Sequence, residues 1–213
     1  MKYSSIALPF ILSLALSAPL AAAEPGWTFQ ASFGGAQSLR SRLTIRQDGF
    51  QDLRLNAHWE TKPFTEPIYY SARLGRWSRR GGWELELIHH KLYLQNRPPE
   101  VEHLEVSHGY NLVTVNRGWD LGPVLLRAGA GPVVAHVEGA VRGRRIDTGG
   151  YKVTGPALQV GVEKRLTLRE RWLLGIEGKI SAARAVIPVP GGELDAPNYA
   201  GHLLVNLGYR WGG

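Results

Sequence analysis

The sequence contains no cysteine, so an exported product would depend on something other than disulfide bonds for its stability. Beyond residue 23 it also lacks long hydrophobic runs, because the later apolar stretches are strand-sized and interrupted by Arg, Glu or Gly. A Walker loop, a dinucleotide fingerprint, a G-x-S-x-G elbow and an H-E-x-x-H motif are all missing. The sequence therefore excludes a bundle of membrane helices after residue 23 and offers no familiar catalytic signature.

The first 23 residues have the three parts of a secretory signal peptide. Lys2 is followed by an apolar run from Ile6 to Leu16 and by the small residues of 21–23, which predicts cleavage before Glu24. The short apolar core argues against a retained membrane anchor. We expect residues 1–23 to be a cleaved signal peptide and residues 24–213 to form one domain.

The last part of the chain shows period-2 alternation, which indicates a strand with one apolar face. In the run 202–211, HLLVNLGYRW, the apolar face is formed by Leu203, Val205, Leu207, Tyr209 and Trp211. Such a terminal strand fits a transmembrane barrel that closes on its first strand, and a soluble sandwich is the alternative. Export without cysteine favours the barrel, in which every backbone group is paired around the ring.

Eight strand candidates can be marked along the chain, and the connections between them alternate in length. The candidates are 27–36, 68–77, 83–93, 103–117, 121–136, 151–166, 171–184 and 201–211. The long connections are 37–67, 137–150 and 185–200, the connection 94–102 is of medium length, and the short ones are 78–82, 118–120 and 167–170. Outer-membrane barrels have short periplasmic turns and long outer loops. We predict an all-β fold, an eight-stranded antiparallel up-and-down transmembrane β-barrel that is monomeric in the outer membrane of a Gram-negative bacterium.

Charged residues alternate with apolar ones on several of these strands. We expect them to face the lumen as a paired network that leaves no open pore, and they are Arg73, Glu84, Glu86, Glu163, Arg165, Glu177 and Lys179. The formal charge of the whole chain is +7. In an exported protein this favours an anionic partner such as the phosphates of lipopolysaccharide over nucleic acid.

Histidine and glutamate occur at one end of three consecutive strand candidates. His89 or His90 ends one strand, His108 begins the next, and His136 and Glu138 end the third. Because adjacent strands lie side by side, these groups could converge near the outer leaflet. Imidazole and carboxylate suit a divalent cation or proton transfer. The alternative is that they are interfacial residues that hydrogen-bond to lipid headgroups.

Segments along the whole of residues 24–213 resemble the lipid A oxidase family, small outer-membrane barrels of Gram-negative bacteria. These segments are IYYSARLGRW (68–77), WELELIHHKLY (83–93), VSHGYNLVTVN (106–116), GPVVAHVE (131–138), GPALQVGVEKRL (155–166) and RWLLGIEGKIS (171–181), and HHKLY, SHGYN and AHVE are the most specific parts. The resemblance implies oxidation of the proximal glucosamine of lipid A to an aminogluconate unit with molecular oxygen as co-substrate.

The resemblance also implies roles for the residues at the strand ends. His89, His108, His136 and Glu138 would be catalytic or would bind a divalent metal ion. Substrate, including the lipid A phosphates, would be held by Lys91, Asn111, Arg142, Arg144 and Arg145.

Two other functions stay open. The chain could be a non-enzymatic barrel that supports membrane integrity or adheres through its loops, whereas the charged lumen disfavours a small-molecule conduit. The SHGYN stretch is also similar to the outer-membrane lipid A deacylase, which places a histidine two residues before its serine. Here Ser107 directly precedes His108, so the two side chains point to opposite faces of a strand, and we rank this alternative lower.

Overall fold

The computed structural model describes residues 25–212, and all regular structure in this range is β-strand. The predicted signal peptide, residues 1–23, lies outside the described residues. No helix in residues 25–212 has the length and apolar character needed to cross a membrane.

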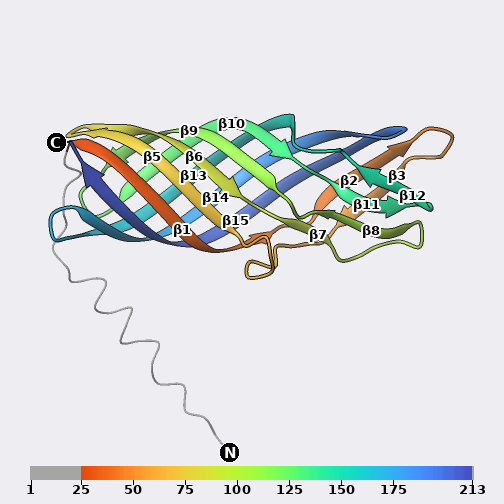
Figure 1. The fold of residues 1–213 in the computed structure, drawn as a ribbon, viewed down its shortest axis with the longest axis horizontal. Helices are drawn as coiled ribbons and strands as arrows, with labels where there is room; N and C mark the ends of the chain where they lie inside the picture. Colours follow the sequence, from red (N-terminus) through yellow and green to blue (C-terminus); the bar gives the residue numbers. More distant parts are fainter. Residues whose placement is uncertain (1–24, 213) are drawn as a thin grey trace, which may run out of the picture.

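Eight antiparallel strands form a closed ring, which confirms the predicted barrel (Figure 1). Their order around the ring follows the chain, and pairing of the last strand with the first closes it. The strands are β1 (Gly26–Ser38), β5 (Tyr70–Ser78), β6 (Gly81–His89), β9 (Tyr110–Asp120), β10 (Leu125–Ala135), β13 (Lys152–Leu168), β14 (Trp172–Val189) and β15 (Gly192–Trp211).

The exterior of the ring is apolar, as the alternation predicts. Leu85, Val160 and Val205 are among its exposed hydrophobic residues, while their neighbours in the chain point inward. Exposed tryptophans lie near the end that carries the C-terminus and the short turns, as in the aromatic belt of a membrane protein, and they are Trp27, Trp83, Trp172 and Trp211. An apolar exterior around a charged interior is the arrangement of an outer-membrane β-barrel, and this chain is one.

The interior of the ring is filled by ion pairs. Glu86 accepts hydrogen bonds from Arg73 at 2.8 Å and from Lys179 at 2.5 Å, and Arg73 also reaches Glu177 at 2.7 Å. Four basic and four acidic side chains take part, which balances the charge, and they are Arg73, Arg127, Arg165, Lys179, Glu84, Glu86, Glu163 and Glu177. The predicted lumen residues are therefore all confirmed, and Arg127 is an addition.

Beyond the ring, at the end opposite the C-terminus, the chain forms a further layer of strands, the extension (Figure 1). It contains β2 (Ser41–Gln47), β3 (Leu53–Ala57), β4 (Trp59–Glu60), β7 (Leu92–Leu94), β8 (Val101–Val106), β11 (Glu138–Val141) and β12 (Arg144–Asp147). One sheet, β4-β7-β8-β11-β12, is separate from the ring, whereas β2 and β3 continue the ring sheet beside the upper end of β15. The residues expected to form long outer loops are thus largely paired strands.

The core of the extension is apolar, unlike the lumen of the ring. Leu43, Ile45, Val141 and Ile187 are each fully buried there. Tyr110 lies at its base and donates a hydrogen bond to the carbonyl of Ala196 at 2.8 Å. The outer segments therefore form a packed unit with its own hydrophobic core.

The prediction that 185–200 is a long loop is wrong, because β14 and β15 continue to a tight turn at Pro190 and Gly191. Pro188 lies where β14 no longer pairs with β13 and forms an edge. Pro197 lies between the part of β15 that pairs with β2 and the part that pairs with β1. Neither proline has to donate a ladder hydrogen bond, so both are tolerated.

Replacement of Glu86 by glutamine tests the role of the lumen network. Loss of its charge leaves Arg73 and Lys179 with too few anionic partners, and breaking a buried network typically costs about 3–5 kcal/mol. We expect Glu86→Gln to lower the free energy of unfolding from lipid vesicles in urea by that order. The control is Arg184→Ala, which removes an exposed pair with Asp195 and should cost less than about 1 kcal/mol. Equal losses in the two variants would contradict a structural role for the lumen charges.

Candidate functional site

The candidate site lies where three ring strands pass into the extension. β6 gives way to β7 across His90 and Lys91, β9 follows β8 after 107–109, and β11 follows β10 after 136–137. Gly109 permits the second of these breaks, because its φ of 134° lies in a region that L-residues rarely adopt. The three breaks are neighbours because β6, β9 and β10 are adjacent in the ring.

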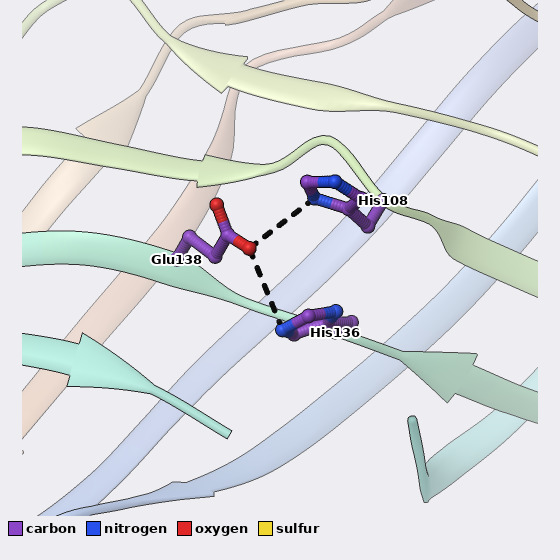
Figure 2. Close-up of side chains that lie close together, drawn as sticks. All are labelled: His108, His136 and Glu138. Carbon is purple, nitrogen blue, oxygen red and sulfur yellow. Dashed lines mark ion pairs between the residues drawn. The ribbon is translucent and has the colours of Figure 1, made fainter. Parts of the chain in front are cut away.

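His108, His136 and Glu138 converge on the outer surface at this junction (Figure 2). Oε1 of Glu138 lies 3.4 Å from Nδ1 of His108 and 3.6 Å from Nε2 of His136. The ring centroids of the two histidines are 5.3 Å apart. One nitrogen of each imidazole and one carboxylate oxygen all lie within 4.8 Å of one another, so the three side chains could hold one metal ion.

Strand alternation places this cluster on the exterior. Val133, Ala135 and Val137 are buried inside, so His136 and Glu138 point to the opposite side. The side chain of His108 is 49% exposed, that of Glu138 33% and that of His136 16%. The site is therefore half-open, and a substrate could approach it from outside the barrel.

Two residues that the sequence interpretation missed support the cluster. Asp147 stands opposite Glu138 on β12, with Oδ1 3.4 Å from Nε2 of His136. A hydrogen bond from the amide of Gly149, together with His136 and Arg145, holds the pKa of the Asp147 carboxyl below its ordinary value. The Tyr151 hydroxyl donates a hydrogen bond to the carbonyl of His108 at 2.7 Å. Asp147 could have been found from the sequence VRGR (141–144). With its two middle residues as a hairpin turn, Asp147 pairs with Glu138.

His89 and Asn111 form a second polar pair on the same outer surface. Nδ1 of His89 lies 2.8 Å from Oδ1 of Asn111, and its ring stacks on Tyr70 at 5.1 Å between centroids. His89 is only 5% exposed and is not one of the three residues whose ligand atoms converge. Its neighbour His90 points inward, where its ring lies 5.4 Å from that of His202. The structure thus brings together three of the four predicted catalytic residues.

The predicted phosphate-binding residues do not gather at one place. Lys91 is buried and donates a hydrogen bond to the carbonyl of Thr65 at 2.5 Å. Arg142 and Arg144 lie over the ring of Phe50 at 4.7 and 4.8 Å, which joins the tips of two hairpins. Arg145 adjoins the cluster through Asp147 at 2.8 Å, and its side chain is 82% exposed. Arg145 is therefore the one predicted basic residue that an anion beside the cluster could reach.

Comparison with known proteins adds only similarities of fold. No family model matches the sequence, and no curated protein matches it. Among solved structures, Ail of Yersinia pestis aligns over 88% of this chain and 99% of its own, with 10% identity and a TM-score of 0.42. Neisserial surface protein A aligns over 87% and 97%, with 11% identity and a TM-score of 0.44. OprG from Pseudomonas aeruginosa aligns over 89% and 98%, again with 11% identity and a TM-score of 0.44. Similarities at this level do not extend to function.

Substitution of Gly109 tests how the strand break positions the site. A Cβ at this position would come within 2.2 Å of the Asn111 side chain, in a backbone conformation that already disfavours alanine. We expect Gly109→Ala to lower the free energy of unfolding by about 1–3 kcal/mol, the usual cost of such strain. The control is Gly178→Ala, because a Cβ there meets nothing within 4 Å and φ is not positive. Unchanged stability of Gly109→Ala would show that the break does not depend on this glycine.

Proposed function

We propose that the chain is an outer-membrane enzyme that oxidises the glucosamine backbone of lipid A with molecular oxygen, and that His108, His136 and Glu138 form its site. The observation that carries the proposal is the place of this cluster: on the outside of the barrel, half-exposed, at the level where the apolar surface ends. The resemblance of the HHKLY, SHGYN and AHVE segments to lipid A oxidases supports the same reaction.

The end of the apolar surface can be followed on three neighbouring strands. On β6 the outward side chains run from Trp83 through Leu85 and Leu87 to His89. On β9 they run from Trp119 to Asn111, and on β10 the outward Val134 is followed by His136. Each strand therefore becomes polar toward the extension, where the sugar and phosphate groups of the outer leaflet begin.

The cluster offers the acid–base groups that sugar oxidation requires. One oxygen of Glu138 faces both imidazoles, and this carboxylate could accept a proton from a sugar hydroxyl. Arg145, exposed beside the cluster, suits a phosphate of lipid A. Two electrons must also pass from the sugar to oxygen, and imidazole and carboxylate cannot accept them.

A cluster of arginines on the extension favours a second candidate function, non-enzymatic attachment to anionic polysaccharide. Arg40, Arg42 and Arg54 line a groove of about 560 Å³ on its surface together with Ser41 and Asn56. Such a groove could bind an anion without any chemistry. The deacylase alternative is weaker, because Ser107 and Glu138 both approach the same nitrogen, Nδ1 of His108, at 3.4 Å. A serine hydrolase needs its nucleophile and its acid on different nitrogens of the histidine.

Mass spectrometry of lipid A tests the enzymatic proposal. Lipid A incubated in air with the purified protein in detergent should gain one oxygen atom, and the same mixture without oxygen should not. Glu138→Gln and His108→Ala should lower this conversion at least about 100-fold, the usual scale for a lost acid–base group. The control is His103→Ala, which removes another histidine paired with a glutamate on the extension. An unchanged lipid A spectrum for folded wild-type protein, judged by its heat-dependent migration on a gel, would favour the second candidate.

A further inference from the structure

We infer that His108, His136 and Glu138 form a mononuclear site for a divalent transition metal, with iron(II) the ion that the donor set suits best. The inference deepens the proposed function, on which its catalytic meaning rests. The binding of the ion, however, can be measured without any lipid substrate.

The separations within the cluster are too long for hydrogen bonds and short enough for ligands of one ion. The two His–Glu distances of 3.4 and 3.6 Å exceed the roughly 2.7–2.9 Å of a charge-assisted hydrogen bond. In octahedral coordination with bonds of about 2.1 Å, neighbouring donor atoms lie about 3.0 Å apart, and donor atoms on opposite sides of the ion lie about 4.2 Å apart. All three donor atoms lie within 4.8 Å of one another, so small side-chain rotations bring them onto one ion.

Several ion pairs of the lumen are shorter than the contacts of this cluster. Arg73 approaches Glu86 at 2.8 Å and Arg127 approaches Glu163 at 2.7 Å, which are distances of direct bonds. In the cluster, a single oxygen of Glu138 faces one nitrogen of each imidazole. One cation placed between the three donors would interact favourably with all of them.

The type and number of the donors indicate the kind of metal. Two imidazoles and one carboxylate with further positions open are typical of non-haem iron(II) sites that use oxygen. A structural zinc site would be closed by four protein ligands, and the chain has no cysteine to supply a thiolate. The exposed faces of His108 and Glu138 leave the remaining positions open toward the exterior. An ion here would supply the electron transfer that the side chains cannot.

Asp147 borders this site without being one of its ligands. It lies 3.4 Å from Nε2 of His136, but its own oxygens accept hydrogen bonds from the Gly149 amide at 2.7 Å and from Arg145 at 2.8 Å. Those bonds hold the Asp147 carboxylate in place, next to the same nitrogen of His136 that faces Glu138. It is not one of the three residues whose donor atoms converge.

Metal titration of the detergent-solubilised protein tests the inference. The chelator-stripped barrel is titrated without oxygen with iron(II), and with cobalt(II) as an air-stable probe, by calorimetry and visible absorption. We expect one ion per chain, and at least about 10-fold weaker binding in His108→Ala, His136→Ala and Glu138→Gln, by the scale of losses at metal sites. His103→Ala should bind as the wild type does. Binding should weaken in acid, because protons compete with the ion for the imidazoles.

The possible outcomes distinguish an error in the metal site from an error in the proposed reaction. Stoichiometric binding that all three variants retain, or no binding of either ion by folded protein, would overturn the metal site. Asp147→Asn should weaken binding less than Glu138→Gln does, and the reverse order would overturn the ligand assignment. If metal-stripped protein still oxidises lipid A, the inference is wrong and the proposed function stands. If the ion binds but lipid A stays unchanged in air, the site stands and the proposed function is wrong.

Discussion

The structure depends on one constraint: the apolar side chains of each strand must face an apolar medium. This medium lies outside the strands in the ring and inside them in the extension. In the ring the medium is outside, so Leu85 and Val205 point outward and Arg73 and Glu86 are enclosed. In the extension the apolar region is the core, so Ile45 and its neighbours point inward and the exterior is polar. The candidate site lies where the two patterns meet.

The change between the two patterns interrupts the regular pairing of the backbone. Several strands are interrupted at this level, with β1 ending at Ser38, β6 at His89 and β10 at Ala135. Inside, a polar layer separates the charged lumen from the apolar core. His202 anchors it, with Nδ1 2.7 Å from the Tyr69 hydroxyl and Nε2 2.8 Å from that of Ser181. On the outer surface, the residues at these interruptions are not held in regular strand pairing, so their polar side chains can converge.

The ring and its lumen could be predicted because alternation alone decides which face a residue occupies. Glu84 and Glu177 needed nothing more than their apolar neighbours to be placed inside. The outer hairpins could not be predicted in this way. Their register depends on which two residues make each turn, and Pro190–Gly191 and Arg142–Gly143 are not strong hairpin signals.

The same limit explains what was missed at the site. His136 and Glu138 are two residues apart, so alternation placed them on one face. Asp147 joins them only through the β11–β12 register, and Tyr151 only through the path of the chain after it. Arg142 and Arg144 were expected to bind phosphate, but their contacts with Phe50 depend on packing between hairpins distant in sequence. Charge alone could not indicate that packing.

The position of the site relative to the lipid surface is the central claim, and the absence of cysteine allows a direct measurement. Single cysteines at Val134 and Ala140 would lie on the outward face below and above the cluster, and each can carry a fluorophore. In vesicles, quenchers attached to lipid tails should quench the label at 134, and a water-soluble quencher should quench the label at 140. Quenching of both labels by the aqueous agent alone would place the cluster in water, away from lipid A, and would contradict the account.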